Sequence, residues 1–413
     1  MTSRERSDPG WAVSSSMDLA GVRRHNLALV FRSIHDHGPC SRAQLSTRTG
    51  LTRAGVGKIV EDLLARGLVR DLGVTGAPRV GRPAAMLQVD GLAAACVGIE
   101  INRFHIATMV TDLTGHEVFT LRRSVPDEGQ SPERMLTAVD MLLAPTLAAA
   151  RDSCRMIGRI TLAAPGIVNP GLGVLVDSPA LGWRDVNLRE QLADLIDCPI
   201  AAVGIDSIGS LATLAESRLP EYRGVRSMVR LEAGVGIGSG YMLDGRAQRG
   251  AAGMAGTIGH CVVDPGGPVC ACGRRGCLDA YAGLPALLQA AAPDLSSHHP
   301  GDAVDRVAEL ARRAATGDRR AVAGIRHVGT WLGRGASILI NVLDPATLVL
   351  GGFVTSLARW ILPTLESELD ARVPNPARAH CRVEVSALGR DGALIGAAVA
   401  GRDHILDDPM QIQ

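Results

Sequence analysis

Residues 256–281, GTIGHCVVDPGGPVCACGRRGCLDAY, constrain the fold of this chain most strongly. One histidine and three cysteines lie close together in this glycine-rich run: His260, Cys270, Cys272 and Cys277. An imidazole and three thiolates suit tetrahedral Zn²⁺, and the glycines allow the tight backbone that brings these ligands around one ion. The alternative is four unrelated side chains, since cysteine often serves as a small buried apolar residue. Because four protein ligands leave no position for a catalytic water, we predict a structural zinc site.

Composition limits the classes to which the chain can belong. With 413 residues, 46% of them hydrophobic but only 3% aromatic, we expect two or three domains with aliphatic cores. The net charge of +1 gives no overall electrostatic argument for a partner, although the region before residue 90 is basic. No apolar run approaches the ~18 residues of a membrane span, and the N-terminus lacks the apolar core of a signal peptide. We therefore expect a cytoplasmic protein with no membrane partner.

The N-terminal region predicts a helix-turn-helix. Residues 1–20 are polar, and we expect a disordered tail. Apolar residues recur at near-helical spacing over residues 22–37. Ser41 and Thr52 are favourable N-cap residues for two further helices, which we expect to end near residues 49 and 66. Two helices joined by a short turn at Gly50 form the helix-turn-helix arrangement.

A basic hairpin follows these helices and predicts a wing. Residues 70–90 consist of two extended stretches joined by a tip rich in glycine, proline and arginine. The N-terminal end of the helix that starts at Thr52 would enter the major groove of DNA, and the wing tip would contact the phosphate backbone or the minor groove. The alternative is a three-helix packing unit with solvated arginines. We predict a DNA-binding domain over residues 21–90, with these candidate contacts: Ser41, Arg42, Thr52, Arg53, Lys58, Arg79 and Arg82.

Residues 91–413 show a different, α/β pattern. Three consecutive strands are followed by alternating helices and strands, then by a glycine-containing hairpin and a mostly helical remainder. This order predicts a two-lobed α/β fold with a cleft. We expect strands at 96–101, 105–112, 117–124, 159–167, 199–206, 228–243 (a hairpin), 346–352 and 381–388, and helices at 132–150, 186–197, 208–218 and 321–340.

Six motifs occur in a characteristic order after the winged helix: VGIEI (97–101), APGIV (164–168), SPALGW (178–183), GVGIGSG (234–240), GHCVVDPGGPVCACGRRGCLDAYAG (259–283) and DPATLVLGG (344–352). Over about residues 22–400 the chain resembles the ROK family, which groups transcriptional repressors with sugar kinases on an actin-like, RNase H-like ATPase fold. The metal segment is the most specific match. The resemblance implies zinc on His260, Cys270, Cys272 and Cys277, and binding of operator DNA as a homodimer or homotetramer.

The phosphate-binding motifs of the family's kinases are altered in this chain. The kinases carry D-x-G-G-T at the first hairpin, where glycines let backbone N–H groups approach phosphate. Here Glu100 is followed by Ile101, Asn102 and Arg103, with no glycine. In the second phosphate segment, Val235 stands where the family often has threonine, and valine supplies no hydroxyl.

The positions that correspond to the catalytic base and the sugar ligands are altered as well. When the chain is aligned with the kinases through the Ala-Glu pair at 215–216, the position of their general base falls on Ile208, which cannot accept a proton. An alignment shifted by two residues would make Asp206 the base instead. Ala180 and Thr257 replace an asparagine and a glutamate that bind sugar, whereas His260 is retained and Asp279 is a shortened glutamate. We expect a ligand pocket formed by Asp206, Thr257, His260 and Asp279.

These features predict a DNA-binding transcriptional regulator, a repressor of the ROK type, over a winged helix-turn-helix and a two-lobed actin-like domain with structural zinc. The kinase-like domain is expected to have no catalytic residues and to sense a small, sugar-like effector. The alternative is an active ATP-dependent sugar kinase that also binds DNA. A third interpretation, a scaffold protein, would require that the basic module has no salt-dependent affinity for DNA.

Overall fold

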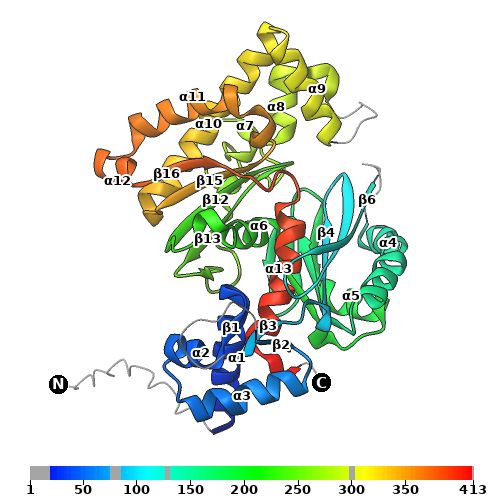
Figure 1. Ribbon diagram of the computed structural model, residues 1–413. Coiled ribbons are helices and arrows are strands. Elements are labelled where there is room, and N and C mark those ends of the chain that lie inside the picture. The colour runs from blue at the N-terminus through cyan, green and yellow to red at the C-terminus, as the bar shows by residue number, and fades with distance from the viewer. Residues whose placement is uncertain (1–18, 75–84, 126–130, 297–302, 412–413) are drawn as a thin grey trace, which may run out of the picture. The chain divides into compact units, whose positions relative to one another are not determined.

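The computed structural model describes residues 19–74, 85–125, 131–296 and 303–411 (Figure 1). Contacts divide the chain into two compact units. The first unit contains residues 1–90 together with 405–413, and the second contains residues 91–404. Residues 1–18 of the expected tail lie outside the described residues, and the first helix already begins at Leu19. Across the described ranges, no helix is long and apolar enough to cross a membrane.

The first unit is a winged helix. Three helices and a three-stranded sheet of order β1-β3-β2 enclose a hydrophobic core that includes Phe31, Leu45 and Val60. The C-terminal residues belong to the same unit, because Nη2 of Arg32 pairs with Oδ1 of Asp407 at 2.7 Å. The elements are α1 (Leu19–His37), β1 (Cys40–Ser41), α2 (Arg42–Thr49), α3 (Arg53–Ala65), β2 (Val69–Val74), β3 (Ala85–Val89) and η6 (Pro409–Gln411).

Local sequence fixes the turn between α2 and α3. The Ser41 hydroxyl accepts a hydrogen bond from the backbone N–H of Gln44, and the Gln44 side chain accepts one from the N–H of Ser41, which makes a capping box. Gly50 ends α2 with φ of 71°, in the left-handed region that favours glycine. Thr52 then caps α3 by accepting from the N–H of Gly55 at 3.1 Å. The predicted helix boundaries are confirmed to within a residue or two.

The second unit contains two five-stranded sheets with the same strand topology. In each, an antiparallel three-strand meander is extended by two parallel strands, in the orders β6-β5-β4-β7-β11 and β14-β13-β12-β15-β16. The first comprises β4 (Ala95–Ile101), β5 (His105–Thr111), β6 (Glu117–Ser124), β7 (Ile157–Ala164) and β11 (Val203–Ser207). The second comprises β12 (Ser227–Ala233), β13 (Ile237–Leu243), β14 (Arg246–Ala247), β15 (Thr347–Gly352) and β16 (Arg382–Val385).

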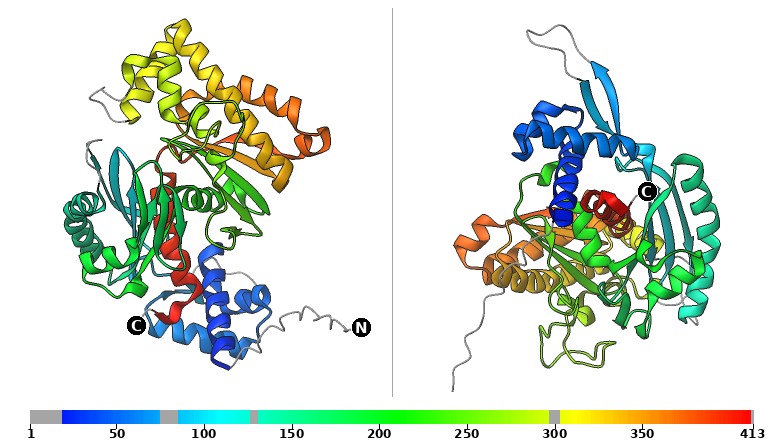
Figure 2. Two further views of the ribbon diagram at one scale, coloured as in Figure 1. Left: turned by 180° about the vertical axis from the view of Figure 1, so that it is seen from behind. Right: turned by 90° about the horizontal axis from the view of Figure 1, so that it is seen from below.

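Helices cover both sheets. The first sheet packs against α4 (Pro132–Ser153) on one face, while α13 (Gly392–Asp407) approaches Gly98 of β4 so closely that a Cβ there would lie 2.6 Å from the carbonyl oxygen of Leu394 (Figure 1, Figure 2). The second sheet contacts α6 (Ile208–Ser217) through β12 and β13. Its lobe is completed by α8 (Leu284–Ala291), α9 (Ala303–Ala315), α10 (Arg319–Leu343) and α11 (Val354–Arg372).

Two sequence expectations in this unit were wrong. A single strand was expected over residues 199–206, but the strand begins at Val203, because residues Ile200–Ala202 form a 3₁₀ turn after Pro199. No strand was expected between the strand at 159–167 and the helix at 186–197. The structure has a three-stranded antiparallel sheet there, made of β8 (Ile167–Asn169), β9 (Val174–Ser178) and β10 (Trp183–Val186). The following helix, α5 (Leu188–Ile196), begins two residues later than expected and is capped by Asn187.

Candidate metal centre, cleft and nucleic-acid interface

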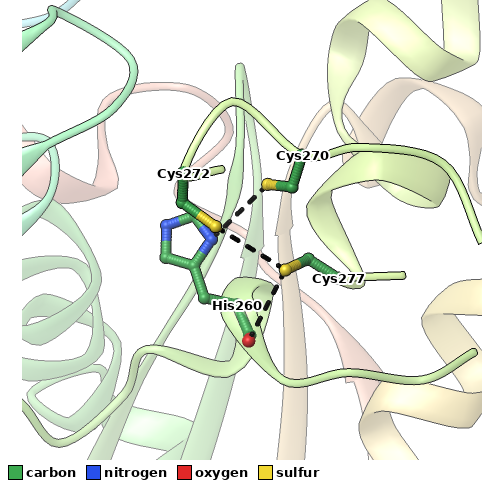
Figure 3. Close-up of side chains that lie close together, drawn as sticks. All are labelled: His260, Cys270, Cys272 and Cys277. Atoms are coloured by element: carbon green, nitrogen blue, oxygen red, sulfur yellow. Dashed lines mark hydrogen bonds between the residues drawn. The ribbon is translucent and has the colours of Figure 1, made fainter. Parts of the chain in front are cut away.

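The structure brings the four predicted metal ligands together (Figure 3). One ligand atom from each of His260, Cys270, Cys272 and Cys277 lies within 4.8 Å of all the others. The Sγ atoms of Cys272 and Cys277 are 3.7 Å apart, and Sγ of Cys270 is 3.8 Å from Nδ1 of His260. A tetrahedron with Zn–S bonds of 2.3 Å has edges of roughly 3.7 Å. The donor set and its spacing therefore fit one tetrahedral zinc ion.

Glycines and short backbone bridges shape the metal loop. Gly276 has φ of 72°, and a Cβ at this position would lie 1.6 Å from the carbonyl oxygen of Asp264, so only glycine fits. An isolated β-bridge between Val262 and Cys277 closes the loop. Tyr281 anchors it, because its hydroxyl donates to Oδ2 of Asp264 at 2.5 Å and its ring stacks on Trp331 of α10 with centroids 3.7 Å apart.

The electrostatics of the loop favour a bound cation. Burial and the neighbouring thiols raise the pKa of Cys277 to about 12, and burial likewise raises the pKa of Cys270. Three ionised thiolates at this separation need a positive charge between them, which a divalent metal supplies. The adjacent Cys261 is exposed and does not belong to the cluster.

A cleft of about 440 Å³ lies in the second unit, lined by the β4–β5 turn, the β12–β13 turn, the start of α6 and the loop before the metal site. Three of the four residues predicted for the ligand pocket line it, namely Thr257, His260 and Asp279. Asp206 is not among the lining residues, whereas Ile208 and Ala180 are.

The end of the cleft beside β4 has no glycine cradle for phosphate. The β4–β5 turn is held by side chains: Nδ2 of Asn102 donates to Oε1 of Glu100 at 3.2 Å, and Oδ1 of Asn102 accepts from the N–H of Arg103 at 2.9 Å. Nη1 of Arg103 donates to the carbonyl of Ala180 at 2.9 Å. Phe104 packs against the core of the opposite lobe, and Arg306 of α9 lies over its ring at 4.5 Å. The β4–β5 turn therefore presents side chains, and no glycine, to this end of the cleft.

The residue expected at the position of a general base is apolar. Ile208 is the first residue of α6 and lines the cleft. Asp206, two residues earlier, is 5% exposed, and its Oδ2 accepts from Nε of Arg249 at 2.6 Å while Oδ1 accepts from the N–H of Ser207. Both carboxylate oxygens of Asp206 therefore already have a donor within the second unit.

The remaining pocket residues are also engaged locally. Oδ1 of Asp279 accepts from the N–H of Ile237 at 2.6 Å, and burial raises the pKa of Asp279. The Thr257 hydroxyl donates to the carbonyl of Met254 at 2.6 Å. Nδ1 of His260 faces the cysteines, which leaves its Nε2 for a ligand in the cleft.

Sequence reasoning missed four ionisable residues that line the cleft, which are His105, Asp177, Glu232 and Arg390. Nε2 of His105 lies 3.1 Å from Oε1 of Glu100. The His105–Glu100 pair could have been found from the hairpin register, because the two residues flank the short turn between β4 and β5. Glu232, one strand position before the second turn, adds a negative charge to the cleft.

The predicted DNA-contacting residues occupy different environments in the first unit. Arg53 and Lys58 are exposed on α3, and Lys58 is the only lysine in the sequence. Ser41 and Thr52 are committed to helix capping. Nη1 of Arg42 lies 4.0 Å from Oδ2 of Asp71. Arg79 and Arg82 of the expected wing tip lie outside the described residues.

The chain combines a winged helix with a two-lobed domain that has two five-stranded sheets of the same topology and a His-Cys₃ cluster. This combination is the one expected of a regulator of the ROK type. The ROK family model matches residues 96–403, and the chain belongs to the ROK family. A MarR family model matches residues 28–75, within the winged helix.

Relatives and solved structures agree with this assignment. The chain is 27% identical to the xylose repressor of Bacillus subtilis over 395 residues, which cover 95% of this chain and 99% of the relative. It is 28% identical to the DNA-binding transcriptional dual regulator NagC of Escherichia coli over 397 residues, 95% and 96% of the two chains. A ROK family transcriptional regulator, a homologue of the E. coli MLC protein, superposes with a TM-score of 0.79 at 23% identity over 95% of this chain and 99% of that one. A ROK family glucokinase from Streptomyces griseus, in complex with glucose and AMPPNP, gives 0.63 at 24% identity, over 75% and 99%.

Proposed function

We propose that this protein is a transcriptional regulator, a repressor, which binds operator DNA through α2, α3 and the wing and senses a small ligand in its cleft. The observation that carries the proposal is the exposure of Arg53 and Lys58 on the helix of a winged helix that precedes a ROK domain. Within the described residues, neither side chain has an ion-pair partner, so both charges are available to DNA. Related proteins of nearly the same length are named as repressors.

Replacing Arg53 by alanine is expected to weaken operator binding by about tenfold, the effect of removing one base or phosphate contact. The operator is first obtained by selection from a random DNA library with the purified protein, and affinities are then measured at several salt concentrations. The control is Arg226→Ala, which removes an exposed arginine of the second unit that pairs with Asp244. Equal affinities of Arg53→Ala and the wild type would contradict the assignment of α3. Selection without any enriched sequence would favour a scaffold instead.

The single lysine allows a second, independent test of the same DNA interface. An amine-reactive acylating reagent can modify only Lys58 and the N-terminal amine in this chain. Operator DNA should protect Lys58, as measured by peptide mass spectrometry, whereas DNA of unrelated sequence should protect it less at moderate salt.

We also propose that the ROK domain of this protein does not phosphorylate sugars. Ile208 stands at the base position, Asp206 is paired with Arg249, and the β4–β5 turn lacks a phosphate cradle. ATP consumption with glucose, xylose, mannose and N-acetylglucosamine should therefore stay at the level without sugar, since general-base catalysis alone contributes a factor of about 100 or more. Sugar-dependent turnover would instead support a kinase that also binds DNA.

The remaining assignments complete the proposal. Zinc on His260, Cys270, Cys272 and Cys277 would hold one side of the cleft and contribute folding energy rather than catalysis. Residues 21–90 would form the DNA-binding domain and residues 91–413 the sensing and assembly domain, in a cytoplasmic homodimer or homotetramer. A ligand that changes the closure of the two lobes would then change operator affinity, because the open and closed states would differ in their affinity for the ligand and for DNA.

A further inference from the structure

One carboxylate oxygen in the cleft has no hydrogen-bond donor. Glu100 is the penultimate residue of β4, is 2% exposed and lines the cleft. Its Oε1 accepts from Asn102 and lies 3.1 Å from Nε2 of His105. Its Oε2 is buried and has no partner among the described residues. A buried carboxylate oxygen is normally satisfied, so an unsatisfied one beside a cleft points to a group that arrives with a ligand.

Glu100 is held in its ionised form. Burial acts to raise its pKa, but the hydrogen bonds from His105 and Asn102 and the positive charge of Arg122 outweigh burial, and the pKa lies below its ordinary range. At neutral pH the ligand therefore meets a carboxylate, which accepts hydrogen bonds and attracts positive charge, rather than a carboxylic acid.

The other ionisable side chains that line the cleft include both acidic and basic groups. Within the described residues, its lining contains four carboxylates, one arginine and two imidazoles: Glu100, Asp177, Glu232 and Asp279, with Arg390, His105 and His260. The other three carboxylates have donors, which are Arg184 for Asp177, Arg230 for Glu232 and the N–H of Ile237 for Asp279. Asp177 and Glu232 are thus paired with arginines, whereas among the described residues no arginine or lysine forms an ion pair with Glu100, so that its carboxylate favours a positively charged ligand group.

We propose that the cleft takes a small ligand that carries an ammonium group, and that this group binds Oε2 of Glu100. The inference rests on the proposed function and deepens it by naming the chemical class of the effector. A neutral polyol could donate a hydroxyl to Oε2, but it would leave the carboxylate of Glu100 without an ammonium or guanidinium partner. It would also find an apolar side chain at Ala180 and a hydroxyl already donated to Met254 at Thr257. An ammonium group satisfies the oxygen and the charge together.

Matched sugars that differ by one amine test the proposal directly. Binding of glucosamine and glucose, and of galactosamine and galactose, is measured by calorimetry on the full-length protein, with putrescine and spermidine as amines without a sugar ring. At least one amine should bind about tenfold tighter than its neutral counterpart, the effect of one charge-assisted hydrogen bond. Equal or tighter binding of the neutral members would overturn the proposal, as would the absence of binding by every amine at roughly 10 mM.

A substitution tests whether the ammonium group binds to Glu100. Glu100→Gln keeps the shape and removes the charge, and it should lower the affinity for the bound amine by about tenfold. Asp244→Asn, which removes one exposed carboxylate outside the cleft, should leave that affinity unchanged. Unchanged affinity of Glu100→Gln would refute the assignment. If that variant fails to fold, the wild-type comparison of matched sugars decides alone. If the protein binds an amine but no operator, only the proposed function is refuted. If it binds an operator but no amine, only the inference about the ligand is refuted.

Discussion

Cys272→Ser is expected to abolish stoichiometric zinc binding and to lower the melting temperature of the ROK domain by roughly 10 °C. A serine oxygen is a poor substitute for one of three thiolates, and the Sγ atoms of Cys272 and Cys277 lie 3.7 Å apart, a separation at which one zinc ion would bind both. The metal content of the purified protein is measured by atomic absorption, and unfolding is measured by calorimetry with and without a chelator.

The chain offers a matched control for this substitution. Cys261 lies in the same segment, next to His260, but is exposed and outside the cluster. Cys261→Ser should keep its zinc and its melting temperature. If Cys272→Ser retained one zinc per chain, the ligand assignment would be wrong. If it lost zinc without losing stability, the metal would have no structural role, and the proposal of structural zinc would fail.

Local chemistry made parts of the fold predictable. Ser41 and Thr52 were expected to cap helices, and both do, because a side-chain oxygen that accepts a backbone N–H acts within three residues. The four candidate metal ligands could be found in the same way, since they lie in one short segment whose glycines permit a single tight loop. The order of strands and helices also predicted a two-lobed α/β unit, and the paired five-stranded sheets agree with it.

Features that depend on distant contacts were not predictable. The strands β8, β9 and β10 are three to five residues long, and too short to show a clear alternation of apolar and polar residues. The role of Asp206 depended on Arg249, which lies 43 positions away in the sequence. The unpartnered oxygen of Glu100 appears only once the side chains that surround it are known. Sequence therefore located the cleft but not its charge or its hydrogen-bonding needs.

Arg230→Met is expected to destabilise the ROK domain by about 3 to 5 kcal/mol, because it leaves the buried carboxylate of Glu216, and with it the partly buried carboxylate of Glu232, without a counter-ion. Arg230 on β12 and Glu216 on α6 are both fully buried, and Nη1 of Arg230 donates to Oε2 of Glu216. The same nitrogen donates to Oγ of Ser386 at 2.8 Å, and the Ser386 hydroxyl donates to Glu216 at 2.7 Å. The network joins the second sheet to α6, so the loss should appear as a lower free energy of unfolding in urea.

The double variant Glu216→Gln with Arg230→Met separates the charge from the packing. Removing both charges should restore much of the lost stability, since a buried ion pair replaced by neutral groups is often close to neutral in free energy. Arg226→Ala, which removes an exposed arginine paired with Asp244, should change the stability little. A double variant as unstable as Arg230→Met would indicate that the loss comes from packing of the arginine stem rather than from the unpaired carboxylate.

The pH dependence of Arg230→Met tests whether the unpaired carboxylate is that of Glu216. Burial already raises the pKa of Glu216, and the charge of Arg230 opposes this rise, so removing Arg230 must raise the pKa further. A carboxyl group whose pKa is higher in the folded state favours folding while it is protonated, and that contribution is lost as the pH rises through the folded-state pKa. The deficit of Arg230→Met relative to the wild type should therefore be smallest near pH 4.5, the ordinary value for glutamate, and should grow toward neutral pH. A deficit that does not change with pH would mean that Glu216 stays ionised, and would place its compensating charge on another residue.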